Sequence, residues 1–200
     1  HYGSACRLVR LLGASSELGR HLITHADVLE EITRDPVRLS RDEICDDLLE
    51  VVGAHREGEF MVAEAPIGPA SDRLRLANRR HLVRIASRDV SADDPTEIIE
   101  DIAAELADLA DAIITAALAL ARADCPDHAD ARLAIIAMGK CGAQELNYIS
   151  DVDVIYVAEP AKDGVSSASA VSIATKLAAS VARICSAHSG AGSIWPPVSG

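Results

Sequence analysis

Residues 133–157 read LAIIAMGKCGAQELNYISDVDVIYV, in which two apolar runs enclose two glycines and an acidic segment. The apolar runs 133–138 and 154–157 are short and rich in β-branched residues, which is typical of strands buried in a mixed or parallel sheet rather than of helices. Gly139 and Gly142 come directly after the first run and predict a turn there. The sequence therefore predicts a strand, a glycine turn, a short connector and a second strand.

Asp151 and Asp153 stand at the start of the second predicted strand. Because side chains alternate along a strand, the two carboxylates point to one face, about 7 Å apart along the chain. Carboxylates placed in this way can share a divalent cation. The alternative is structural: Ser150 and Asp151 cap a turn, and Asp153 is an exposed edge residue, since these residue types are common in turns.

The glycine turn before the acidic residues favours a binding site. Gly139 and Gly142 allow backbone amides to approach a phosphate group closely, and Lys140 between them supplies positive charge. The spacing matches neither a Walker loop nor the glycine fingerprint of dinucleotide-binding folds. A phosphate turn about ten residues before two carboxylates indicates chemistry in which Mg²⁺ bridges the phosphates of a nucleotide.

The string Gly-Lys-x-Gly-x-x-Glu-Leu-Asn-x-x-Ser-Asp-x-Asp-Val-Ile over 139–155 closely resembles the polymerase-β-type nucleotidyltransferase motif of glutamine synthetase adenylyltransferase/adenylyl-removing enzymes. The resemblance implies an enzyme with two related halves. One half adds AMP to a tyrosine of glutamine synthetase, and the other removes it by phosphorolysis, which releases ADP. The form of residues 145–148, Glu-Leu-Asn-Tyr, looks more like the amino-terminal, adenylyl-removing half.

The resemblance also assigns expected roles and partners. Asp151 and Asp153 would be the catalytic residues and would hold Mg²⁺. The residues expected to seat the nucleotide phosphates are Gly139, Lys140, Gly142 and Ser150. The implied partners are glutamine synthetase, ATP or ADP, phosphate and a PII-type nitrogen regulatory protein.

Composition excludes several other classes of protein. A formal net charge of −12 argues against nonspecific nucleic-acid binding, which requires a basic surface. The five cysteines show no Cys-x-x-Cys pairing, so reduced thiols in the cytoplasm are expected. Neither a signal peptide nor an apolar run long enough to span a membrane is apparent, so no membrane contact is expected. The chain does not begin with Met, which suggests a fragment.

Upstream of residue 125 the pattern is helical. Apolar residues recur at helical spacing in 4–12 and 17–32, Ser40 and Glu43 form a capping box, and Asp94 with Pro95 starts an amphipathic helix of about 28 residues. Beyond the second strand, residues 168–188 predict one more helix. The expected fold is α+β, with a helical portion at 1–125 and a truncated nucleotidyltransferase core at 126–200.

Two clusters in the helical portion have open interpretations. The arginines of the helix predicted at 72–87 could face nucleotide phosphates or an acidic partner, or they could pair with the acidic helix that follows; pairing is slightly favoured. His21 and His25 lie one helical turn apart, a spacing that could ligate zinc, but no third ligand is evident.

The resemblance ends near the carboxyl terminus. Trp195 and Pro196 fit the family, but the third acidic residue that normally completes the metal site is absent from the chain. The isolated chain is therefore expected to be inactive. Two functions remain open: part of an Mg²⁺-dependent nucleotidyltransferase that modifies glutamine synthetase, or a noncatalytic helical scaffold or nucleotide-sensing module.

Overall fold

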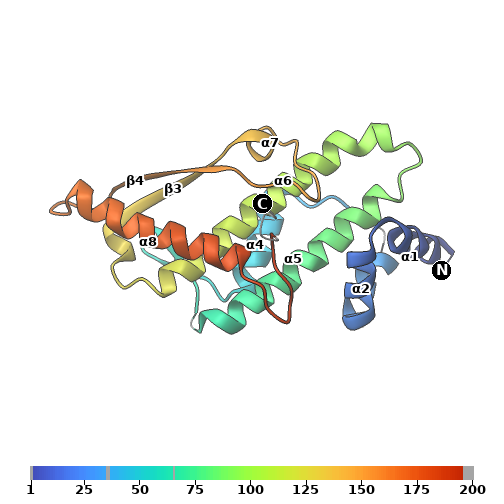
Figure 1. The fold of residues 1–200 in the computed structure, drawn as a ribbon, viewed down its shortest axis with the longest axis horizontal. Helices are drawn as coiled ribbons and strands as arrows, with labels where there is room; N and C mark the ends of the chain where they lie inside the picture. The colour runs from blue at the N-terminus through green and yellow to red at the C-terminus, as the bar shows by residue number, and fades with distance from the viewer. Residues whose placement is uncertain (1, 35–36, 65, 196–200) are drawn as a thin grey trace.

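The computed structural model describes residues 2–34, 37–64 and 66–195, and within these residues the fold is α+β (Figure 1). Two small antiparallel sheets accompany the helices. In chain order the elements are α1 (Tyr2–Ala14), α2 (Ser16–Thr24), η1 (Ala26–Val28), α3 (Leu29–Thr33), α4 (Arg41–Val51), β1 (His55–Glu57), β2 (Phe60–Val62), α5 (Ile67–Asp89), α6 (Pro95–Ala123), η2 (His128–Asp130), β3 (Ala131–Ala137), α7 (Gly139–Gly142), β4 (Val154–Pro160) and α8 (Ser167–Ser186).

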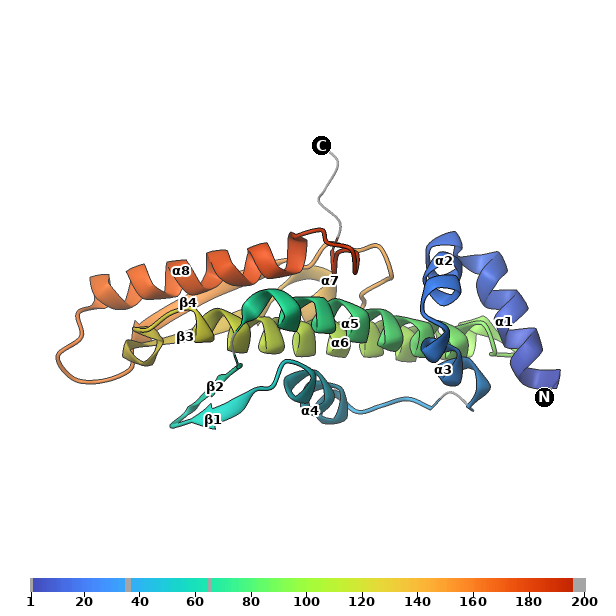
Figure 2. The same cartoon turned by 90° about the horizontal axis from the view of Figure 1, so that it is seen from below.

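The long helix α6 lies in the middle of the molecule. Viewed from the side, α5 and α6 form a central layer, with α8 and the β3–β4 sheet on one side and α4 with the β1–β2 hairpin on the other (Figure 2). The predicted start at Pro95 is confirmed, and the helix runs for 29 residues. Asp94 caps it by accepting a hydrogen bond from the Thr96 amide at 2.9 Å.

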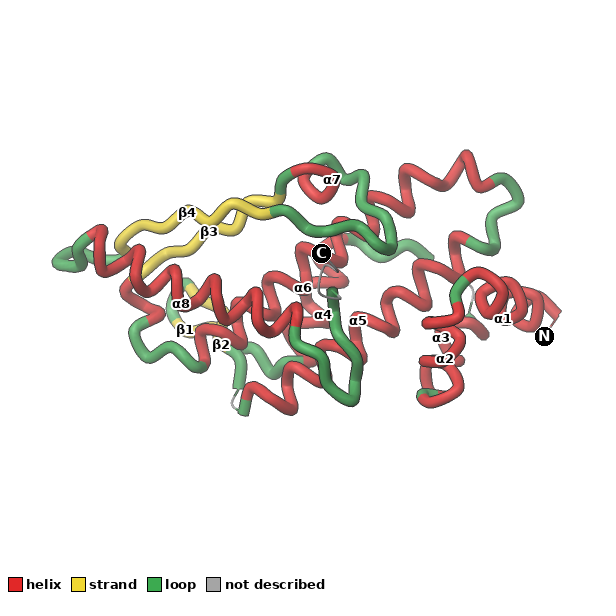
Figure 3. The backbone as a smooth tube through the Cα atoms, viewed as in Figure 1, coloured by secondary structure: helices red, strands yellow, loops and turns green. Residues whose placement is uncertain are grey.

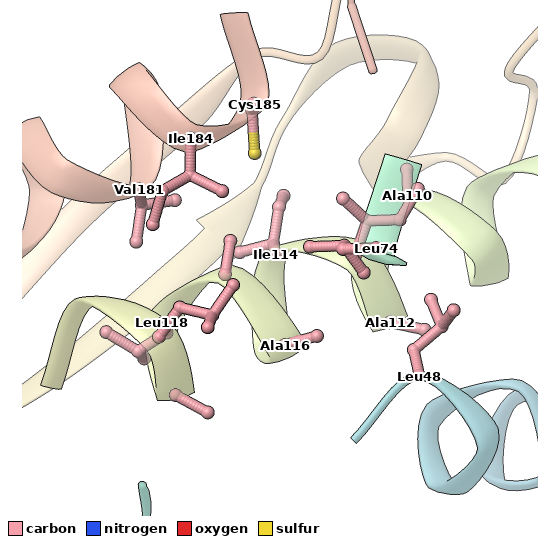
Figure 4. Close-up of a cluster of buried hydrophobic side chains, with 14 of the residues drawn as sticks. Leu48, Leu74, Ala110, Ala112, Ile114, Ala116, Leu118, Val181, Ile184 and Cys185 are labelled. Carbon is pink, nitrogen blue, oxygen red and sulfur yellow. The ribbon is translucent and has the colours of Figure 1, made fainter. Parts of the chain in front are cut away.

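The hydrophobic core is built around the alanine-rich faces of α6. Small side chains let neighbouring helices approach closely, and apolar side chains from three other helices fill the space around them. Figure 4 shows Leu48 of α4, Leu74 of α5 and Val181 and Ile184 of α8 gathered around this helix. The contacts place α8, and with it the β3–β4 sheet, in a fixed position on α6.

Both predicted strands are present, but their predicted environment is wrong. β3 and β4 pair antiparallel, from Ala131 opposite Pro160 to Ala137 opposite Val154. In the described part of the chain one face of this sheet packs on α8, and on the other face Ile136 and Ile155 are nearly half exposed. Apolar residues on both faces made the strands look fully buried, whereas burial depends on which elements cover each face.

Arg84 and Arg88 of α5 pair with the acidic helix α6, as the favoured interpretation predicted, whereas the other arginines of α5 bond carboxylates outside α6 or backbone carbonyl oxygens. Arg84 donates to Glu105 at 2.5 Å, and Arg88 bonds both Glu105 and Asp101. Glu105 is fully buried and also accepts a hydrogen bond from the Leu39 amide at 3.2 Å. The charge pattern of these two helices is therefore an internal ion-pair network rather than two solvated faces.

The remaining helix predictions are confirmed in part, since 4–12 lies in α1 and 72–87 in α5, but 17–32 is divided among α2, η1 and α3. The capping box of Ser40 and Glu43 is formed at the start of α4. The helix predicted at 168–188 is α8; it buries Leu177 and Val181, whereas Val171 is 53% exposed because it lies off the buried side of the helix.

Helix α8 is long and apolar enough to cross a membrane by length and composition, although no such apolar run was expected from the sequence. Its buried side, which includes Ala170, Leu177 and Ile184, packs on α6 and on the β3–β4 sheet. This packing accounts for the apolar residues on the buried side of the helix.

The rings of His21 and His25 lie 4.5 Å apart, centroid to centroid. Among the described residues no group of three His, Cys, Asp or Glu side chains is placed to hold a metal ion. The histidine pair therefore gains no third ligand from the fold.

Candidate functional site

The segment after β3, residues 139–142 with Met138 before it, is the glycine turn predicted from the sequence, and it lies against the acidic residues before β4. The Met138 amide donates a hydrogen bond to the Asp153 carbonyl oxygen at 2.8 Å, which extends the sheet pairing by one step. Gly139 has a φ of +52°, which favours glycine. A Cβ at Gly139 would lie 3.1 Å from Asp153 Oδ2. The fold therefore brings the glycine turn and this carboxylate into direct proximity.

The second glycine is required for the turn to close. A Cβ at Gly142 would lie 2.5 Å from the Ala137 carbonyl oxygen, and the Gly142 amide donates to the Met138 carbonyl at 3.0 Å. The chain thus folds back on the end of β3 with no room for a side chain. Figure 3 shows the resulting helical turn, α7, at the end of the β3–β4 sheet.

We expect Gly142→Ala to distort the turn, because the new methyl group meets backbone rather than a movable side chain. Clashes of this kind typically cost about 1–3 kcal/mol. The change should be visible as faster hydrogen exchange of the amides in 138–145, with Gly68→Ala as control, since nothing lies within 4 Å of a Cβ at Gly68. Equal exchange in the two variants would contradict this account of the turn.

Asp151 and Asp153, from here the acidic pair, both line a cavity of about 410 Å³ between β4, the end of α8 and α6. Both carboxylates are exposed. The cavity wall is otherwise mainly apolar, and the remaining residues that line it are Ile114, Ile135, Val152, Val154, Tyr156, Val181, Ala182, Cys185, Ser186 and Trp195. The site thus combines a carboxylate edge with an apolar interior, which is typical of small-molecule sites.

The other predicted site residues lie around the turn rather than in the cavity wall. Lys140 is exposed on α7. The Ser150 hydroxyl accepts a hydrogen bond from the Asn147 amide at 3.4 Å, within a local turn. Among the residues predicted to seat phosphate, Gly139 lies directly beside the Asp153 carboxylate.

Sequence reasoning missed part of the cavity wall. Tyr156 and Cys185 line the cavity together with Trp195, whose amide donates to the Cys185 carbonyl at 3.1 Å. Burial raises the pKa of the Cys185 thiol to about 12, so the thiol stays protonated. Strand alternation from Val154 would have placed Tyr156 on the inner face; nothing in the sequence places Cys185 beside the acidic pair.

The donor set fits one kind of metal site. Two carboxylates at the edge of a cavity suit Mg²⁺, which proteins usually bind through one or two carboxylates together with the phosphates of a substrate. A closed structural metal site would need more protein ligands, and the described part of the chain offers no group of three. The acidic pair therefore suits a metal that arrives with, or is completed by, a phosphate ligand.

Comparison with known proteins places this chain in a family. The family model described as glutamate-ammonia ligase adenylyltransferase matches residues 5–196. A bifunctional glutamine synthetase adenylyltransferase/adenylyl-removing enzyme of Cutibacterium acnes is 88% identical over 98% of the chain, which covers 20% of that protein. The protein of the same name from Streptomyces coelicolor is 48% identical over 95% of the chain, which covers 18% of that protein. The one from Mycobacterium bovis is 42% identical over 76% of the chain, which covers 15% of that protein.

The chain thus spans a fifth or less of the length of these relatives. The match includes the glycine turn, the connector (residues 143–150) and the acidic pair, because all of them lie within residues 5–196. The chain therefore belongs to the glutamate-ammonia ligase adenylyltransferase family.

Proposed function

We propose that this chain carries part of a nucleotidyl-transfer site that acts on glutamine synthetase with Mg²⁺ as its cofactor. The observation that carries the proposal is the placement of the acidic pair on one cavity, with Gly139 against Asp153. The names of the relatives support the class of reaction and the protein substrate. We further propose that β3, β4 and α8 belong to a polymerase-β-type nucleotidyltransferase core.

The chemistry proposed for these residues is binding and orientation of phosphates. Asp151 and Asp153 would hold Mg²⁺, which when bound supplies positive charge to the phosphate oxygens during transfer. Gly139 leaves space beside Asp153, so that a phosphate oxygen can approach the carboxylate edge and the backbone amides of the turn. Lys140 and Ser150 would then contribute charge and a hydroxyl donor to phosphates that reach beyond the cavity.

We propose that this half of the enzyme removes AMP. An oxygen of inorganic phosphate attacks the phosphorus of the AMP group, a new P–O–P bond forms, and the bond from phosphorus to the tyrosine oxygen breaks. The tyrosine oxygen recovers a proton, and ADP leaves. Support comes from the Glu-Leu-Asn-Tyr form of residues 145–148, which resembles the adenylyl-removing half. A cytoplasmic location and control by a PII-type regulator are part of the same proposal.

The full-length protein tests the function directly. Adenylylated glutamine synthetase, phosphate and Mg²⁺ should yield ADP, and ADP release should stop when EDTA removes the metal. Unmodified synthetase with ATP tests the opposite direction in parallel. Absence of turnover in both assays, with an active relative as positive control, would contradict the proposed function.

A second candidate is a noncatalytic, nucleotide-sensing module. One observation favours this candidate for the 200-residue chain taken without the rest of a longer enzyme. In the described residues the acidic pair has no third carboxylate beside it. We therefore propose that the 200-residue chain by itself is inactive. Titration of ATP or ADP with and without Mg²⁺ separates the possibilities, because a pure scaffold would show no metal-dependent nucleotide binding.

A further inference from the structure

The connector between α7 and the acidic pair, residues 143–150, is fastened to the helices beneath it. Leu146 is 5% exposed and belongs to the main hydrophobic core, whereas Ile149 is 93% exposed. Gln144 and Tyr148 stand two positions on either side of Leu146, and each makes a polar contact with a different long helix. The connector is thus held at three alternate positions.

The first polar contact joins the connector to α6. Gln144 Nε2 donates a hydrogen bond to Asp108 Oδ1 at 3.2 Å. Asp108 is buried, and desolvation raises the pKa of its carboxyl group. Gln144 has a φ of +58°, which is uncommon for a residue that carries a Cβ. Conformations of this kind persist only where surrounding contacts enforce them, and they concentrate at functional sites.

The second polar contact joins the connector to α5. The Tyr148 hydroxyl donates a hydrogen bond to Asp89 Oδ2 at 3.0 Å, at the last residue of that helix. The tyrosine ring lines an apolar cavity of about 270 Å³ together with Leu82 of α5 and Leu11 of α1. Desolvation and the Asp89 carboxylate raise the pKa of Tyr148, so its hydroxyl is protonated and donates at neutral pH.

We propose that Tyr148 and Gln144 are positioning residues for the acidic pair. By fastening the connector to α5 and α6, they hold both carboxylates on the cavity beside the glycine turn. This inference rests on the proposed function, because it concerns the geometry of that same site. Transfer reactions depend steeply on such geometry, and a displacement of about 1 Å can lower a rate by about a hundredfold.

Three substitutions in the full-length protein test the contact between Tyr148 and Asp89. Tyr148→Phe keeps the ring and removes the donor, and it should lower kcat for Mg²⁺-dependent ADP release by about tenfold, with the KM for glutamine synthetase unchanged. Asp89→Ala should give the same loss. Asp89→Asn should keep most of the wild-type kcat, because its amide oxygen can still accept a hydrogen bond from the Tyr148 hydroxyl.

A double-mutant cycle identifies the contact itself. If the two residues act through one hydrogen bond, Tyr148→Phe combined with Asp89→Ala should be no slower than either single variant. Gln144→Glu places a carboxylate against Asp108, so it should also lower kcat. Ile149→Ala is the matched control, since this neighbouring side chain is exposed and should leave kcat near the wild-type value.

Hydrogen exchange adds a readout that does not depend on turnover. In Tyr148→Phe the amides of 149–153 should exchange faster, while the melting temperature stays within a few degrees of wild type. Two results would overturn the inference. One is wild-type exchange of the amides 149–153 in Tyr148→Phe, and the other is a loss in kcat in the double variant equal to the product of the losses in the two single variants.

Asp151→Asn separates this inference from the proposed function. If Asp151→Asn is inactive and Tyr148→Phe turns over like wild type, the positioning role of Tyr148 is contradicted, whereas the proposed nucleotidyl-transfer function is supported. If Asp151→Asn keeps full turnover, the proposed function falls, and the exchange of 149–153 still decides whether Tyr148 holds the connector.

Discussion

Asp151→Asn and Asp153→Asn are each expected to lower Mg²⁺-dependent transfer in the full-length protein by about a thousandfold, because loss of a metal ligand removes several kcal/mol of charge stabilisation from the transition state. Asparagine has nearly the same shape as aspartate, and both side chains are exposed at the cavity edge. The fold should therefore be retained. The measurement is single-turnover ADP release over a Mg²⁺ titration, with circular dichroism and melting temperature to verify folding.

Asp163→Asn is the matched control for these two variants. Asp163 is also an exposed aspartate, and it lies in the loop between β4 and α8 rather than at the cavity. It should retain the wild-type rate and the wild-type Mg²⁺ dependence. If either variant of the acidic pair also kept both, the acidic pair would not be the metal site.

Glu105→Ala is expected to have the largest effect on stability. The substitution removes the carboxylate partner of Arg84 and one of the two carboxylate partners of Arg88, and it leaves the Leu39 amide without its acceptor. Arg84 is 6% exposed, so its charge would stay buried without compensation. Breaking a buried ion pair in this way typically costs about 3–5 kcal/mol. Because ordinary domains are stable by only about 5–15 kcal/mol, much of the α5–α6 unit would open.

Native-state hydrogen exchange of the α6 amides in the full-length protein measures this effect locally. A loss of about 3–5 kcal/mol corresponds to exchange faster by about a hundredfold to about five thousandfold. Glu100→Ala is the control, since Glu100 lies on the same helix but is exposed. Equal exchange in the two variants would show that the buried network contributes little to stability.

Features governed by neighbouring residues could be predicted from the sequence. The capping box at Ser40 and the start of α6 at Pro95 depend on contacts within one helical turn. The two strands follow from short β-branched runs, and the turn after the first strand follows from Gly139 and Gly142. These signals are local, so the chain carries them without reference to the rest of the fold.

The connector contacts could be anticipated only in part. Alternation over 144–148 suggests one buried side, and Leu146 is the apolar residue at its centre. The acceptors Asp89 and Asp108, however, lie 59 and 36 positions earlier in the chain. No local pattern specifies which of the many carboxylates in this acidic chain meets Tyr148 or Gln144.

By itself, the sequence determined the starts of α4 and α6, the presence of β3 and β4, and the glycine turn that follows β3. Only the tertiary structure decided that β3 and β4 pair antiparallel with one face exposed, that Glu105 is buried between arginines, and that Cys185 and Trp195 join the cavity wall. The physical reason is that backbone conformation and capping arise from contacts a few residues apart, whereas burial, ion pairing and cavity shape arise where distant segments pack together.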